Sequence, residues 1–389
     1  MKARPVRPGG VAVEDSSVFA AHAGGKLSIS TALPLQDSRD LSVAYTPGVA
    51  QVSLAISRDP RLGSHYTWAG RLVAVVTDGT AVLGLGNVGP SAALPVMEGK
   101  AALFQRLANI NAIPLALATT DPGEIVEVLT RLRPSFGAVC LEDIAAPRCF
   151  ELEARLVAAL DCPVMHDDQH GTAVAVLAGL QGACTVTGRR LGSCRVVVLG
   201  AGAAGVATAQ LLLAAEIEDV TVLDSQGILT PDRSDMNAAK TDLAARTNPR
   251  GLRGGLAEAL RDADILVGLS SSSVPPHMVA TMAPKPIVFA LSNPVPEIWP
   301  EQVSQYGAIV ATGGSNHSNQ IINLLASPGI FSGALDAAAV AITHRMKLAA
   351  AAAIARVAED RLAVDQIVPH CLDPRVAPAV AQAVIDATG

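Results

Sequence analysis

Five acidic residues stand where predicted strands end, and their chemistry points to one shared site. Asp78 follows the first of four predicted strands, Glu142 and Asp143 follow the third, and Asp167 and Asp168 follow the fourth. Ligands of open α/β sheets bind outside the carboxyl ends of the strands, so we expect these carboxylates to converge. Carboxylate and water oxygens suit Mg²⁺ or Mn²⁺ better than zinc. Either pair alone is better explained as a helix N-cap, but both pairs together favour a metal site.

Two further side chains are candidates for proton transfer. Lys100 interrupts an otherwise apolar predicted helix, where a lysine most often packs its stem and extends its head into water. Beside carboxylates and a metal, a desolvated lysine can instead act as a base. Tyr45, one of only three tyrosines, precedes a Thr-Pro-Gly turn. It is either a half-buried packing residue or a phenolic acid.

A second kind of chemistry is indicated by residues 195–224. An apolar β-branched run turns through Gly200, Ala201, Gly202, Ala203, Ala204 and Gly205, continues as an alanine- and leucine-rich helix, and is followed by a strand that ends at Asp224. The three glycines provide a tight turn, close approach of a pyrophosphate and close packing of helix on sheet. An acid 24 residues after the first glycine suits the adenosine ribose hydroxyls. The stretch predicts a dinucleotide site.

The bare glycine pattern occurs a second time, at Gly84, Gly86 and Gly89. It follows a polar turn, and no acid-tipped strand comes about 20 residues later. We therefore do not expect this second copy to bind a dinucleotide.

The elements that position these residues alternate between strand and helix. Before the dinucleotide motif, strands are predicted at 72–76, 113–118, 138–141 and 163–166, and helices at 92–107, 123–132 and 148–160. Alternation at this spacing indicates parallel βαβ units. We expect an N-terminal α/β domain at 1–165, a doubly wound Rossmann domain at 166–335 and C-terminal helices at 336–389 that pack on the body.

Composition narrows the class of protein. Half of the 389 residues are hydrophobic and 16% are charged, so a large core is available. A net charge of −6 without a basic cluster argues against nucleic acid, and no apolar run is long enough for a membrane span. The six cysteines show no metal-like clustering. We expect a soluble cytoplasmic protein whose first 15 residues form a loose tail.

Several short runs together resemble a known family, the malic enzymes, in particular their short bacterial form. They occur in family order: Tyr45-Thr46-Pro47-Gly48-Val49, Thr77-Asp78-Gly79 with Gly84-Leu85-Gly86-Asn87, Glu98-Gly99-Lys100, Glu142-Asp143, His166-Asp167-Asp168-Gln169-His170-Gly171-Thr172, the glycine motif 200–205, and Leu291-Ser292-Asn293-Pro294. The resemblance implies oxidative decarboxylation of L-malate to pyruvate and CO₂ with a divalent metal. It also implies decarboxylation of oxaloacetate as an additional activity.

The resemblance assigns roles by position. They are metal ligands at Glu142, Asp143 and Asp168, acid and base at Tyr45 and Lys100, a carboxylate paired with that base at Asp167, cofactor contacts at Thr172, residues 200–205, Asp224 and Asn293, and substrate amides at Asn293 and Asn323. NAD is favoured because Asp224 repels a 2′-phosphate, but Arg233 or Lys240 could reverse that preference. A homodimer or higher homo-oligomer is expected.

One departure from the larger family members affects the substrate. Many of them carry a carboxylate-binding arginine two residues after the Thr-Asp-Gly run, where this chain has Thr80 and Ala81. We expect backbone amides of residues 86–89, ahead of a helix that begins at Pro90, to replace it together with Asn323. Two other functions stay open: a metal-independent, amino-acid-dehydrogenase-like oxidoreductase, and a non-catalytic dinucleotide sensor.

Overall fold

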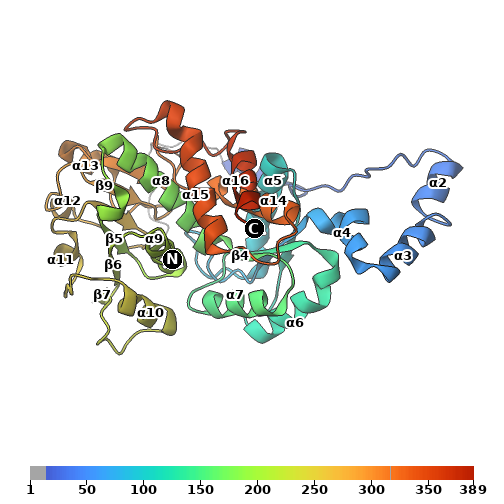
Figure 1. Ribbon diagram of the computed structural model, residues 1–389, viewed down its shortest axis with the longest axis horizontal. Helices are drawn as coiled ribbons and strands as arrows, with labels where there is room; N and C mark the ends of the chain where they lie inside the picture. The colour runs from blue at the N-terminus through green and yellow to red at the C-terminus, as the bar shows by residue number, and fades with distance from the viewer. Residues whose placement is uncertain (1–14, 316) are drawn as a thin grey trace.

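The computed structural model describes residues 15–315 and 317–389, so most of the expected N-terminal tail lies outside the described residues. Two parallel-strand sheets lie side by side, and helices from the C-terminal part of the chain pack across both (Figure 1). Within the described residues, no helix has the length and apolar character needed to cross a membrane.

The first sheet has four parallel strands in the order β2-β1-β3-β4. Its strands are β1 (Leu72–Thr77), β2 (Asn111–Ala116), β3 (Ala138–Leu141) and β4 (Val164–His166), connected by α5 (Pro90–Ala108), α6 (Pro122–Leu132) and α7 (Arg148–Ala159). Every residue of β1 is buried, as expected of a strand covered on both faces. The proline predicted in the first turn of α5 does begin that helix.

The second sheet has six strands in the order β10-β9-β8-β5-β6-β7, and only β7 is antiparallel to its neighbour. The strands are β5 (Arg195–Leu199), β6 (Asp219–Asp224), β7 (Gly227–Ile228), β8 (Ile265–Gly268), β9 (Ile287–Ala290) and β10 (Ile309–Thr312); the helices are α9 (Ala203–Ala214), α10 (Ala238–Arg246), α11 (Leu256–Leu260), α12 (Pro276–Val279) and α13 (Pro300–Val303). This doubly wound order confirms the predicted fold class.

A shared core joins the two sheets to the remaining helices. These are α8 (Thr172–Thr187), α14 (Ser327–Asp336), α15 (His344–Ala358) and α16 (Val376–Asp386). Val73 of the first sheet, Val196 of the second and Ile354 of α15 belong to one continuous cluster of buried side chains. The alanine-rich C-terminal helices therefore pack on the body, as the sequence predicted.

The N-terminal segment contains α1 (Asp15–His22), α2 (Ser38–Ala44), α3 (Val49–Arg58) and α4 (Gly63–Tyr66). Its first part lies against the body, where the backbone amide of Lys26 donates to Glu98 Oε2 at 2.9 Å, but the chain that follows extends away from the body. No residue of α2 or α3 is buried, and Figure 1 shows both helices on a projecting arm. We call residues 27–58 the arm.

Candidate active site

Three of the predicted acids meet at the carboxyl ends of two neighbouring strands. Glu142 and Asp143 follow β3, and Asp168 lies in a π-helical turn, Asp167–Gly171, that follows β4. Each offers a carboxylate oxygen, and these oxygens lie within 4.8 Å of one another. One oxygen of Glu142 and one of Asp143 are buried without a hydrogen-bond partner among the described residues. Clustered carboxylates with unpaired oxygens fit a divalent cation such as Mg²⁺ or Mn²⁺.

Lys100 points from α5 into this cluster rather than into water. Its side chain is 8% exposed, and its ammonium donates a hydrogen bond to Asp167 and lies 3.1 Å from Glu142 Oε1. Burial lowers the pKa of Lys100, but the charges of Asp167 and Glu142 outweigh burial and raise it well above its usual value. The alternative prediction, that Lys100 extends its ammonium into water, is therefore wrong.

Burial also changes the acids themselves. It raises the pKa of Glu142 well above its usual range, against the attraction of Lys100. Burial and the neighbouring charge of Asp168 raise the pKa of Asp143 to about 7. Without a cation, the cluster thus holds fewer negative charges at neutral pH than its composition suggests.

Asp78 does not join the cluster that we expected it to enter. Its carboxylate pairs with Arg148 at the start of α7 and accepts a hydrogen bond from the hydroxyl of Thr80 at 2.6 Å. Arg148 also donates to Thr80 Oγ1 at 2.9 Å. The sequence analysis missed Arg148, because nothing in the spacing indicates that a residue 70 positions later neutralises Asp78.

The turn that carries Asp167 and Asp168 is closely packed. A Cβ atom at Gly171 would lie 1.8 Å from Asp167 Oδ1 and 3.0 Å from Asn323 Cβ, so only glycine fits there. Asn323 therefore lies beside the turn, as its expected substrate role requires. Thr172 follows directly as the first residue of α8.

In the glycine-rich loop at 79–89, three of the four backbone amides that we expected to be free already have local acceptors. The amides of Val88 and Gly89 donate to Gly79 O at 3.1 Å, and the amide of Gly86 donates to Val82 O at 2.8 Å. The loop instead contacts the second sheet, because a Cβ atom at Gly84 would lie 2.9 Å from Pro294 Cδ. The backbone carbonyl of Asn293, which precedes that proline, lies near the same loop, whereas its side-chain amide lies against Gly313, just after β10.

The dinucleotide motif has the geometry that its residue types predicted. Gly200 has φ +119°, and a Cβ atom there would lie 2.4 Å from Leu269 O. A Cβ atom at Gly205 would lie 1.8 Å from Gly200 O, whereas one at Gly202 would meet nothing within 4 Å. Gly202 is the N-cap of α9, so the open space in front of it fits a pyrophosphate.

Asp224 is the last residue of β6, and its carboxylate is paired with two cationic side chains. Arg233 donates to both of its carboxylate oxygens, at 2.9 and 3.0 Å, and Lys240 donates to one at 2.7 Å. Burial raises the pKa of Asp224, but these hydrogen bonds more than offset it and lower the pKa to about 2. The negative charge that would repel a 2′-phosphate is thus matched by two cations.

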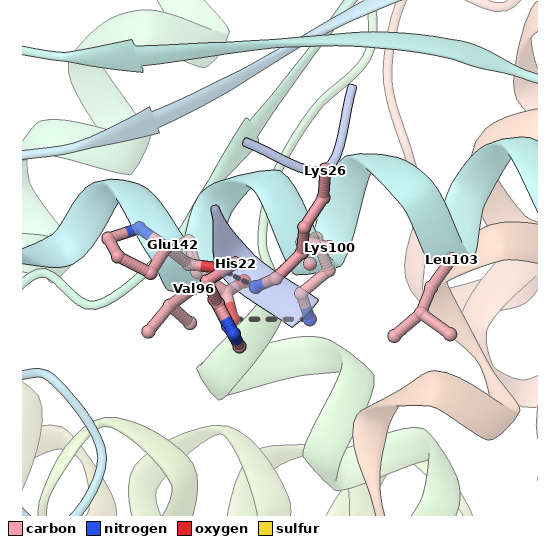
Figure 2. A pocket seen from close by; sticks show the side chains of 8 residues that line it. His22, Lys26, Val96, Lys100, Leu103 and Glu142 are labelled. Carbon is pink, nitrogen blue, oxygen red and sulfur yellow. Dashed lines mark hydrogen bonds and ion pairs between the residues drawn. The ribbon is translucent and has the colours of Figure 1, made fainter. Parts of the chain in front are cut away.

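Tyr45 is the one candidate catalytic residue that the chain does not bring to its own site. It directly follows α2 and is 67% exposed, whereas Lys100 is buried on α5. Figure 1 shows α2 on the arm and α5 within the body. A cavity of about 400 Å³ opens beside Lys100 and Glu142. Pro95, Val96, Gly99 and Leu103 of α5 form a mainly apolar wall of this cavity, and His22 and Lys26 complete its lining (Figure 2). The ammonium of Lys26 donates to Pro95 O at 2.6 Å.

Comparison with known proteins agrees with this architecture. Residues 24–122 match the model of the malic enzyme N-terminal domain, and residues 169–388 match that of the malic enzyme NAD binding domain. The chain is 47% identical over 371 residues to an NAD-dependent malic enzyme of Geobacillus stearothermophilus, covering 95% of this chain and 78% of the relative. It is 48% identical over 367 residues to a bifunctional malic/malolactic enzyme of Bacillus subtilis, covering 93% and 90%.

Solved structures show the same likeness in three dimensions. An NAD-dependent malic enzyme from Thermotoga maritima superposes with a TM-score of 0.91 at 42% identity, covering 96% of this chain and 99% of that one. A malic enzyme from Pyrococcus horikoshii gives a TM-score of 0.92 at 42% identity, covering 95% and 89%. The fold and the glycine turn define a two-domain oxidoreductase of the NAD(P)-binding class. Within that class, the chain belongs to the malic enzyme family.

Proposed function

We propose that this chain catalyses the oxidative decarboxylation of L-malate to pyruvate and CO₂ with reduction of NAD or NADP. The observation that carries the proposal is the buried ammonium of Lys100, held between Asp167 and Glu142 at the edge of a three-carboxylate cluster. The dinucleotide loop of the second sheet supplies the cofactor site.

The carboxylates of Glu142, Asp143 and Asp168 would hold Mg²⁺ or Mn²⁺. When bound, the metal supplies Lewis acid chemistry, stabilising negative charge on the C2 oxygen of the substrate, and the nicotinamide accepts the hydride from C2. Asn293 and Asn323 are proposed to orient the substrate and the nicotinamide amide, and Thr172 to contact the cofactor.

Lys100 acts as the base in this proposal. It takes the proton of the C2 hydroxyl as the hydride leaves, and Asp167 holds its ammonium in place. With Glu142 shared with a cation, Lys100 would lose part of the attraction that raises its pKa, so a larger fraction of the lysine would be neutral and able to accept a proton. Loss of the C4 carboxylate as CO₂ then leaves an enolate that needs a proton at C3.

Tyr45 of the partner subunit is proposed to supply that proton. The arm exposes large apolar side chains that a monomer would leave in water: Ile29 at 87%, Val43 at 69% and Leu41 at 55%. The cavity beside Lys100 has an apolar wall and a volume sufficient for a phenol ring. A homodimer that exchanges its arms covers these side chains and completes each site.

For the cofactor, we propose that NADP is used as well as NAD. Asp224 alone favours the free ribose hydroxyls of NAD. Arg233 and Lys240 lie directly on its carboxylate and provide charge-assisted donors for a 2′-phosphate.

The reaction is tested with purified protein, L-malate and Mn²⁺, by following the absorbance of reduced nicotinamide with each dinucleotide and assaying pyruvate, before and after EDTA. We expect metal-dependent formation of reduced cofactor and an equal amount of pyruvate. Reduction that survives metal removal, or dinucleotide binding without turnover, would instead support a metal-independent oxidoreductase or a sensor.

A further inference from the structure

Glu153 of α7 is a buried carboxylate that the proposed reaction does not use. Its side chain is 13% exposed. One oxygen accepts the backbone amide of His166 at 2.7 Å, and the other bonds to His170 Nε2 at 2.9 Å. These two partners flank the turn that carries Asp167 and Asp168, one residue before it and near its end. Glu153 therefore bridges the turn from outside the site.

The charges around Glu153 keep it ionised. Burial raises its pKa, but the interaction and hydrogen bond with His170 and the nearby charge of Lys347 outweigh burial and lower the pKa to about 2. Lys347 belongs to α15, so a C-terminal helix also favours the ionised form of Glu153. A charged acceptor makes hydrogen bonds roughly twice as strong as a neutral one.

The side chain of His166 gives the turn no further hydrogen bond within the part of the chain that the structure describes. Both ring nitrogens of the buried His166 lack a hydrogen-bond partner among the described residues, and Nδ1 lies 3.9 Å from Asp168 Oδ2. Asp168 in turn accepts the backbone amide of Asp143 at 2.9 Å. A shift of the turn would therefore separate Asp168 from Asp143 and Asp167 from Lys100 together.

We propose that Glu153 is a positioning residue of the active site: by holding His166 and His170, it fixes the turn on which Asp167 meets Lys100 and Asp168 meets the other carboxylates. It touches neither substrate nor cofactor and acts only through this turn. The inference rests on the proposed metal site. Replacing a residue that orients metal ligands without contacting the metal typically lowers metal affinity about 10- to 100-fold.

The test measures Mn²⁺ affinity in the absence of substrate, by the electron paramagnetic resonance of free Mn²⁺, in E153A, E153Q and wild type. The matched control is E151A on the same helix, because Glu151 is 63% exposed and pairs only with Arg155 one turn away. We expect E153A to weaken Mn²⁺ binding about 10- to 100-fold, with NADH affinity close to wild type and a lower Tm, because the His166 amide loses its acceptor. E153Q keeps an acceptor for the His166 amide but lacks the charge, so its Mn²⁺ affinity should lie between those of E153A and wild type.

Two results would overturn the inference. One is wild-type Mn²⁺ affinity in both Glu153 variants. The other is parallel loss of Mn²⁺ affinity, NADH affinity and Tm in E153Q, which would reduce Glu153 to a general packing role. Failure of the wild-type protein to bind Mn²⁺ would contradict the proposed metal site itself, so the two failures are distinguishable.

Discussion

Lys100 and Asp167 lie 67 positions apart in the chain, yet their side chains form a hydrogen-bonded ion pair that is almost completely buried. The lysine comes from α5 and the aspartate from the turn after β4. An ion pair in such a place is costly to bury and indicates a function other than stability.

If this lysine is the base, removing its amine stops proton transfer while leaving the dinucleotide site intact. We expect K100M to lower kcat by about 10²- to 10⁴-fold, the range typical for loss of a general base. D167N keeps the amine but loses the charge that holds it, so it should lower kcat less. Steady-state kinetics together with NADH affinity check both variants. Unchanged kcat in K100M would remove the lysine from the mechanism.

The position of Tyr45 leads to a mixing experiment. If each site joins Lys100 of one subunit with Tyr45 of its partner, K100M and Y45F, each nearly inactive, should complement when their subunits are exchanged. Random reassociation would restore about one quarter of the sites. The matched control mixes K100M with D167N, whose changes fall on the same half of the site and should restore nothing. Absence of recovery with Y45F would place both residues in one subunit.

The sequence predicted well what local spacing determines. Gly200 and Gly205 have the close backbone approaches and Gly202 the open space that their pattern predicted, and Glu142, Asp143 and Asp168 do converge. The sequence was less informative where a contact between distant residues determines the structure of the site. Arg148 removes Asp78 from the cluster, and the loop amides at 86, 88 and 89 are consumed by local hydrogen bonds. Neither outcome can be predicted from composition or hydrophobic periodicity, because each depends on which groups the fold brings together.

The second and third glycines of the dinucleotide motif should behave differently when replaced by alanine. A Cβ atom at Gly202 meets nothing within 4 Å, so G202A should keep wild-type Tm and lose affinity only for the dinucleotide. A Cβ atom at Gly205 lies 1.8 Å from Gly200 O, so G205A must displace α9 from β5. Such overpacking typically costs about 1–3 kcal/mol, and Tm should fall as well. Thermal unfolding and NADH titration separate the two effects; equal Tm losses would contradict the reading of Gly202.

Lys240 should matter for NADP and not for NAD. Its ammonium lies 2.7 Å from Asp224 Oδ2, where the 2′-position of the ribose is expected. Hydrogen bonds to charged groups contribute about 1.5–3 kcal/mol, so K240A should raise the KM for NADP by about 10-fold or more with little change for NAD. R246A is the control, because Arg246 lies on the same helix and pairs with Asp242. Equal KM changes for both cofactors would indicate a different position for the ribose.

Lys347 should make the stability of the folded protein depend on pH in the alkaline range. Burial, only partly offset by Glu153, lowers its pKa from 10.5 to about 8; His170, His166 and His344 are the other titratable groups nearby. Between these two values the unfolded chain binds the proton and the folded chain does not, so stability rises with pH, by at most about 1.4 kcal/mol per pH unit. Below the folded pKa both states are protonated and the slope vanishes. The Tm of wild type should therefore rise relative to K347M between about pH 7.5 and about pH 9.5. Parallel Tm profiles would mean that Lys347 keeps its proton in the folded protein throughout this range.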